Sequence, residues 1–163
     1  MEMQHDQQQH KMTSGKMMYR KFALMILLSF IAMYILMYAM VNNFSNVIPC
    51  VNQFYMAGLM TMPMIILEIA IMGGMYIKKK LNVAIILAGI VGLAAFFFCI
   101  RQQAAVGDRQ FLKSMIPHHA AAILMVEKAS LNDPEIKKLA QDIITAQQAE
   151  IAQMKAKLKE MEK

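Results

Sequence analysis

Three long apolar stretches lie within the first two thirds of the chain. They run over residues 22–41, 54–77 and 83–100, and each comes close to the roughly 20 residues that a helix needs to cross a bilayer. Hydrocarbon offers no water to backbone polar groups, so a segment that lies in it must be helical. The pattern predicts a three-span transmembrane region over residues 22–100, whose first span is a retained anchor because it is too long for a signal peptide.

The remaining residues, 101–163, alternate apolar and polar positions with the period of a helix. One amphipathic helix is expected from about Arg109 to Ser130. Asp133 and Pro134, which are typical N-cap and N1 residues, open a second helix that runs to the end. Two such helices joined by a turn form an antiparallel hairpin, so the predicted fold class is all-α.

Apolar positions define the seam along which the two helices of the hairpin should pack. In the first helix these positions are Phe111, Met115, His118, Ala122, Met125 and Ala129, and in the second they are Ile136, Ala140, Ile143, Gln147, Ile151, Met154, Leu158 and Met161. A single hairpin is small for an independent core. We therefore expect two copies to dimerise into a four-helix bundle, or the hairpin to pack on the membrane region.

Basic residues between the apolar stretches predict the orientation of the chain. Lys11, Lys16, Arg20 and Lys21 precede the first span, the loop 42–53 has no Lys or Arg, and Lys78–Lys80 follow the second span. Short loops rich in Lys and Arg remain on the cytoplasmic side. Residues 1–21 are therefore expected to form a flexible cytoplasmic tail containing Met and His, and residues 101–163 to lie outside, in the periplasm of a bacterial inner (cytoplasmic) membrane. The net charge of +6 is explained by orientation rather than by nucleic-acid binding.

Methionine is abundant, with 19 residues, whereas tryptophan is absent. In a hairpin that turns near residue 132, Met115 and His118 lie level with Gln147, Glu150 and, one turn on, Met154. Thioether and imidazole donors together suit Cu(I). The same methionines also fit a structural interpretation as flexible core fillers. His118 opposite Gln147 is harder to explain in that way, because buried polar groups need partners.

Three short motifs resemble the domain of unknown function 305 family. They are Met115-Ile116-Pro117-His118-His119, Asp133-Pro134-Glu135, and the run from Ala146 to Met154, and the resemblance covers roughly residues 105–158. It implies a ferritin-like helical fold, export from the cytoplasm and an association with copper. The metal ligands that it implies are His118, His119, Met115, Met125 and Met154, with Gln147 and Glu150 as supporting residues behind them. Ala120 and Lys157 depart from the family pattern, and the first departure removes a potential oxygen ligand.

The second apolar stretch carries its own periodic set of sulfur donors. Met56, Met60, Met64, Glu68, Met72 and Met75 recur every three or four residues and should share one helix face, with the Glu68 carboxyl near the bilayer centre. This stripe is either a path for Cu(I) or apolar filler beside a hydrogen-bonded acid. Cys50 and Cys99 should lie at the outer rim, where a disulfide, a soft ligand pair and two unpaired thiols all remain open.

Together these features predict a membrane-anchored copper-binding protein that buffers or hands on Cu(I) in the periplasm and contributes to copper homeostasis or tolerance. The alternatives are a copper transporter that uses the stripe on the second span, and a structural membrane partner without a metal. Expected partners are the lipid bilayer, further copies of the chain in a homo-oligomer, and copper export or chaperone proteins. Catalysis is not expected, because the chain lacks the His-Glu-x-x-His and Glu-x-x-His patterns of metalloenzymes and any Gly-rich phosphate loop.

Overall fold

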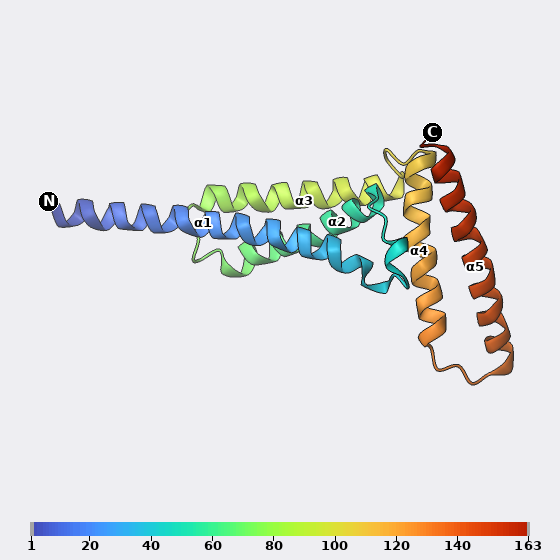
Figure 1. Ribbon diagram of the computed structural model, residues 1–163. Coiled ribbons are helices and arrows are strands. Elements are labelled where there is room, and N and C mark those ends of the chain that lie inside the picture. Colours follow the sequence, from blue (N-terminus) through green and yellow to red (C-terminus); the bar gives the residue numbers. More distant parts are fainter. Residues whose placement is uncertain (1, 163) are drawn as a thin grey trace. The chain divides into compact units, whose positions relative to one another are not determined.

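The structure is a computed structural model that describes residues 2–162, with side chains described at residue 15 and from residue 17 onward. Within this range the fold consists of helices and contains no strand, which confirms the all-α class (Figure 1). The α-helices are α1 (Glu2–Leu36), α2 (Val51–Met72), α3 (Lys79–Arg101), α4 (Asp108–Lys128) and α5 (Pro134–Glu160), and two 3-10 turns span Met37–Met40 and Phe44–Asn46. The chain divides into two compact units, one made of residues up to 34 with 55–101 and the other of residues 35–54 with 102 onward.

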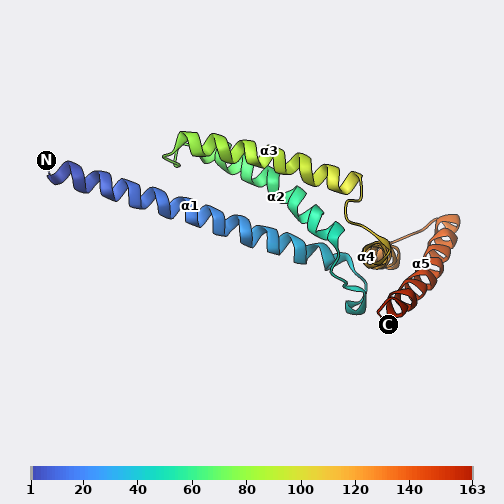
Figure 2. The ribbon, with the colours of Figure 1, turned by 90° about the horizontal axis from the view of Figure 1, so that it is seen from above.

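The first unit contains three helices that run side by side in both views of the ribbon (Figures 1 and 2). The segments Met17–Met40, Val51–Met72 and Lys79–Arg101 are long and apolar enough to cross a membrane. Three apolar helices of this kind match the number that the sequence predicts.

The helix boundaries in this unit differ from those expected. Helix α2 begins at Val51 and ends at Met72, so the predicted span to residue 77 was too long at its end. Gly73 and Gly74 follow α2, and glycine is a common residue just after a helix. Helix α3 begins at Lys79, four residues before the expected start, because lysine is a good helix former that an apolar pattern does not include.

Helix α1 continues back to Glu2, through the segment that we expected to be a flexible tail. This segment is rich in Gln, Lys and Met, which are favourable helix residues, and contains no proline. The side chains of the two histidines of this segment, His5 and His10, lie outside the described residues. The backbone of this segment is helical, and its flexibility and cytoplasmic location stay predictions.

Glycines allow close contact between α2 and α3. A Cβ atom added at Gly58 would lie 2.4 Å from the ring of Phe96, and one added at Gly92 would lie 2.6 Å from the sulfur of Met62. Side chains larger than hydrogen at these points would push the two helices apart. The helices therefore approach through small residues, as helices in membranes commonly do.

The second unit is built on a helical hairpin of α4 and α5. The Asp133 side chain caps α5 by accepting hydrogen bonds from the backbone nitrogens of Glu135 (2.8 Å) and Ile136 (3.0 Å), with Pro134 at the start of the helix. The core cluster consists of Ile116, Ala120, Ile123, Ile151 and Leu158. The expected seam of α5 is confirmed at its centre, where Ala140, Ile151 and Leu158 are buried.

The expected seam of α4 is wrong by about one residue. The buried positions are Ile116, Pro117, His119, Ala120 and Ile123, whereas His118 is exposed and Met125 keeps 53% of its surface exposed. Val41 and Ile48, from the segment between α1 and α2, pack against the same core. The orientation of α4 is therefore set by that segment as well as by α5, which a two-helix pattern does not include.

Candidate functional site

His119 is a buried polar side chain that connects the two helices of the hairpin. It is 8% exposed, its Nδ1 lies 2.9 Å from the backbone oxygen of Met115, and its Nε2 lies 2.7 Å from Oε2 of Glu150 on α5. A carbonyl oxygen can only accept, so Nδ1 carries the proton that it donates to Met115. This donation fixes the ring and directs Nε2 toward α5.

The contact between His119 and Glu150 is short and solvent-accessible on one side. The side chain of His119 is 11% exposed, whereas that of Glu150 is 53% exposed. One proton lies between Nε2 and the carboxylate, which makes this a charge-assisted hydrogen bond. Because Glu150 is half exposed, its carboxylate is able to leave Nε2 without opening the core.

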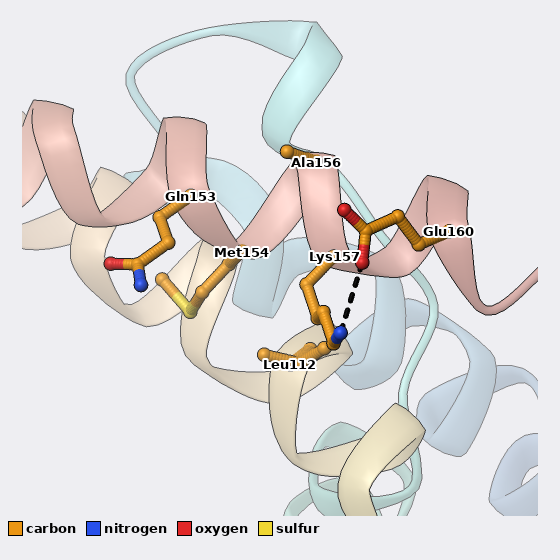
Figure 3. A pocket seen from close by; sticks show the side chains of 6 residues that line it. All are labelled: Leu112, Gln153, Met154, Ala156, Lys157 and Glu160. Carbon is orange, nitrogen blue, oxygen red and sulfur yellow. Dashed lines mark hydrogen bonds and ion pairs between the residues drawn. The ribbon is translucent and has the colours of Figure 1, made fainter.

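Two thioethers lie about one helical turn from this pair, both toward the start of α4 and the end of α5. Met115 precedes His119 by four residues on α4, and Met154 follows Glu150 by four residues on α5, so each shares a face with its partner. Both methionines are half-buried. Met154 packs against the core, extends from α5 toward α4 beside Leu112, and lines an open pocket of about 530 Å³ (Figure 3).

Gln147 contributes a buried oxygen atom to the same face of α5, three residues before Glu150. Its Oε1 has no hydrogen-bond partner among the described residues. A buried acceptor without a partner costs about 1–3 kcal/mol. The hairpin thus holds a polar atom without a partner about one turn from the His119–Glu150 contact.

Two of the expected ligands lie away from this cluster. His118 is exposed, and its ring centroid lies 6.1 Å from that of His119 with the planes at 63°. Met125 lies six residues beyond His119, or about 9 Å along the helix, and lines an apolar pocket with Ile136 and Leu139. Across the described residues, no group of three or more His, Cys, Asp or Glu side chains is placed to hold a metal ion.

The methionine stripe of α2 lies beside the packed face of that helix. The buried residues are Ala57, Gly58, Thr61, Ile65 and Ile69. In contrast, Met56, Met60 and Met72 are exposed, and Met64 and Glu68 are half-buried. Met75 lies in the turn after α2, so its predicted place on the helix face was wrong. Glu68 lies four residues, or about 6 Å, from the end of α2, which corrects its expected position near the centre of the span.

Glu68 belongs to a polar network that sequence reasoning did not foresee as a whole. The hydroxyl of Tyr76 donates to Oε1 of Glu68 (3.1 Å), and the amide of Asn82 donates to the carbonyl oxygens of Gly73 (3.3 Å) and Tyr76 (3.1 Å). Tyr19 donates its hydroxyl to Oδ1 of Asn82 (2.7 Å). Burial, then the hydrogen bond to Glu68 and its charge, raise the pKa of Tyr76 above 10.0. The feature of the sequence that could have indicated this network is Asn82, a polar residue two positions after the three lysines 78–80.

The two cysteines are free thiols, so the structure contains no disulfide between the described cysteines. Cys50 is buried in the second unit, and Cys99 is half-buried in the first. Whether the two cysteines form a disulfide or a ligand pair at the outer rim stays a prediction.

Comparison of the sequence with known proteins shows the family of the chain. Residues 100–158 match the family described as "Domain of unknown function (DUF305)". The chain is also similar to a protein of Acanthamoeba polyphaga mimivirus described as "Uncharacterized protein L153", with 38% identity over 145 residues, which cover 84% of this chain and 90% of the viral protein. No solved structure matches the chain. The chain belongs to the same family as the mimivirus protein and carries a DUF305 domain at residues 100–158.

Proposed function

We propose that the protein is a membrane-anchored copper-binding protein whose α4–α5 hairpin binds Cu(I) and buffers it or hands it on, contributing to copper homeostasis or tolerance. The observation that carries the proposal is the orientation of His119. Its Nδ1 is held by the carbonyl of Met115, and its Nε2 points between the helices toward a carboxylate that is able to move.

This orientation is the one that metal-binding histidines commonly have. A ligating imidazole usually donates its second nitrogen to a carbonyl or carboxylate, which fixes the tautomer and leaves the first nitrogen for the metal. In His119 the fixed nitrogen is Nδ1, so Nε2 is the donor atom for the metal. Glu150 then competes with the metal for Nε2, rather than supporting the ring from behind as the resemblance implied.

The flanking methionines determine which metal this position favours. Met115 and Met154 supply neutral, soft thioether sulfur about one helical turn from the His119–Glu150 pair, one from each helix. Thioether and imidazole together select Cu(I) over hard cations, which require several oxygen ligands. Binding would release the proton shared with Glu150, because imidazole binds a metal only through a free lone pair.

The proposed topology places the hairpin on the side of the membrane opposite to the N-terminus. Lys78 precedes α3 and Lys79 and Lys80 begin it, on the same side as Arg20 and Lys21, and three crossings carry residues 102–162 to the other side. In a bacterial inner membrane that side is the periplasm. Tag accessibility in intact membranes tests this orientation, and a C-terminal tag on the same side as the N-terminus would contradict it.

The exposed residues of the hairpin support assembly of two copies into a four-helix bundle of the ferritin-like kind. Phe111, Met125, Ile136 and Leu139 are apolar side chains with half or more of their surface exposed. Covering them with a second hairpin would supply the core that one hairpin lacks. In that arrangement the exposed side chains of His118 and Met125 would face the partner copy. Light scattering of the purified full-length protein should give a dimer, and a monomer would contradict this part.

A competition titration tests copper binding directly. The full-length protein is titrated against a chromophoric Cu(I) chelator, and we expect it to withdraw copper from the chelator. His119→Ala and Met154→Leu should weaken the withdrawal, whereas the controls His118→Ala and Met161→Leu, which change exposed side chains, should affect it much less. No competition by the unmodified protein would refute the proposal.

The alternative of copper transport rests on the exposed thioethers of α2. Met56, Met60 and Met72 lie on a face that the described part of one chain leaves uncovered, so a path would require several copies around it. Flux of Cu(I) into proteoliposomes that disappears in Met60→Leu would favour transport. Flux that is absent, or that is unchanged in this variant, would favour the anchor.

A further inference from the structure

A groove on the first unit lies between α1 and α3. It has a volume of about 470 Å³ and is lined by apolar side chains from three helices, namely Tyr19, Phe22, Ala23 and Ile26 of α1, Met62 and Ile65 of α2, and Leu81, Ile85, Ala88 and Gly89 of α3. The lining spans eight residues of α1 and nine of α3, or about 10–12 Å along each helix. That length is less than half of the roughly 30 Å of a hydrocarbon core, so the groove is too short for a complete transmembrane helix.

Basic side chains gather at one end of this groove. Arg20 and Lys21 stand next to Tyr19 on α1, and Lys78, Lys79 and Lys80 immediately precede Leu81 of α3. All five are exposed, and within the described residues none of them forms an ion pair. The first turn of α3 contains no acidic residue that would neutralise them. Tyr19, at the same end, directs its hydroxyl to the polar Asn82, as tyrosines do at a membrane–water interface.

We propose that this groove binds an anionic glycerophospholipid of the adjacent leaflet. One acyl chain lies along the apolar lining, and the phosphate group lies among Arg20, Lys21 and the three lysines at the start of α3, Lys78 to Lys80. A cation cluster next to an apolar groove matches a molecule with a negative head and an apolar chain. The backbone nitrogens at the start of α3 add further donors for the phosphate. This inference concerns the first unit alone and does not depend on copper binding.

Native mass spectrometry of the full-length protein in detergent tests the proposal. The protein is titrated with phosphatidylglycerol or with phosphatidylcholine that has the same acyl chains. We expect phosphatidylglycerol to bind more tightly. Lys79→Gln combined with Lys80→Gln should lower its affinity by about tenfold, because each lysine near a phosphate contributes to the attraction. The paired substitutions Lys137→Gln and Lys138→Gln, on the exposed face of α5, are the matched control and should have no effect.

A second variant tests the contribution of the groove to lipid binding independently of the contribution of the charges. Ala88 is exposed and lines the groove, so Ala88→Phe fills it without burying a clash in the helix core. It should reduce binding of both lipids while leaving the lysines in place. Equal affinity of the unmodified protein for the two lipids would overturn the proposal. The proposal would also be overturned if phosphatidylglycerol binding were unchanged in Ala88→Phe, or if the Lys79 and Lys80 variant behaved like the control.

Discussion

Replacement of Glu150 by glutamine should have opposite effects on stability and on Cu(I) affinity. In the apoprotein the carboxylate accepts a hydrogen bond of 2.7 Å from Nε2 of His119. A hydrogen bond to a charged group contributes about 1.5–3 kcal/mol and a neutral one about 0.5–1.5 kcal/mol. Since the Glu150 side chain is 53% exposed, solvent screening reduces the difference, and we expect the apoprotein to lose about 1 kcal/mol of stability.

The same weakening favours the metal, because Cu(I) must displace residue 150 from Nε2. A competitor that is weaker by about 1 kcal/mol raises the apparent affinity about fivefold. The measurement is the chelator titration combined with chemical unfolding of the apoprotein followed by circular dichroism. The matched control is Glu160→Gln on the same helix, whose carboxylate contacts the exposed Lys157 and not His119.

Two results would refute this reasoning. If Glu150→Gln lowers the affinity for Cu(I), the carboxylate is a ligand or supports one, and it does not compete for Nε2. If stability and affinity both stay the same as in the control, the His119–Glu150 contact does not form in solution.

Three further outcomes follow from the structure. Ile123→Ala removes a side chain that is 1% exposed and should destabilise the hairpin by about 2–5 kcal/mol in chemical unfolding, whereas Ile136→Ala, at a half-exposed position, should cost far less. The raised pKa of Tyr76 means that the folded state holds the phenolic proton more tightly than the unfolded state. The stability contributed by protonated Tyr76 should therefore be present below pH 10.0 and be lost as the pH rises further. Tyr76→Phe should remove this alkaline loss of stability. An alkaline unfolding profile that Tyr76→Phe leaves unchanged would contradict the prediction. Glu68→Gln should lower the pH at which Tyr76 ionises, as followed by difference absorbance against Tyr76→Phe, and should leave Cu(I) affinity unchanged.

The sequence was sufficient to predict elements that depend on local patterns. Helix α5 was placed correctly because Asp133 and Pro134 mark its start and because its apolar positions form one narrow stripe. The three apolar helices were likewise recognisable from length and composition. The predicted ends of these helices were less accurate. A helix can continue into lysines and stop at glycines, and an apolar pattern does not resolve either case.

The candidate site was less predictable, because it depends on the rotation of α4. Apolar residues lie on two neighbouring faces of this helix, one with Met115 and Met125 and the other with Ile116 and Ile123. Adjacent histidines at 118 and 119 give no preference between these faces. The choice is made by Val41 and Ile48, more than 60 residues earlier in the chain, which pack on the face of Ile116. Such a long-range contact has no periodic signal in the sequence, and it buries His119 where the expected seam had His118.

X-ray absorption at the copper edge, measured on the full-length protein loaded with Cu(I), tests the central claim most directly. The proposed Cu(I) site requires a first coordination shell that contains both sulfur and imidazole nitrogen. The nitrogen contribution should disappear in His119→Ala and remain in His118→Ala. A shell of oxygen and nitrogen without sulfur, or a spectrum that His119→Ala leaves unchanged, would contradict a Cu(I) site between α4 and α5.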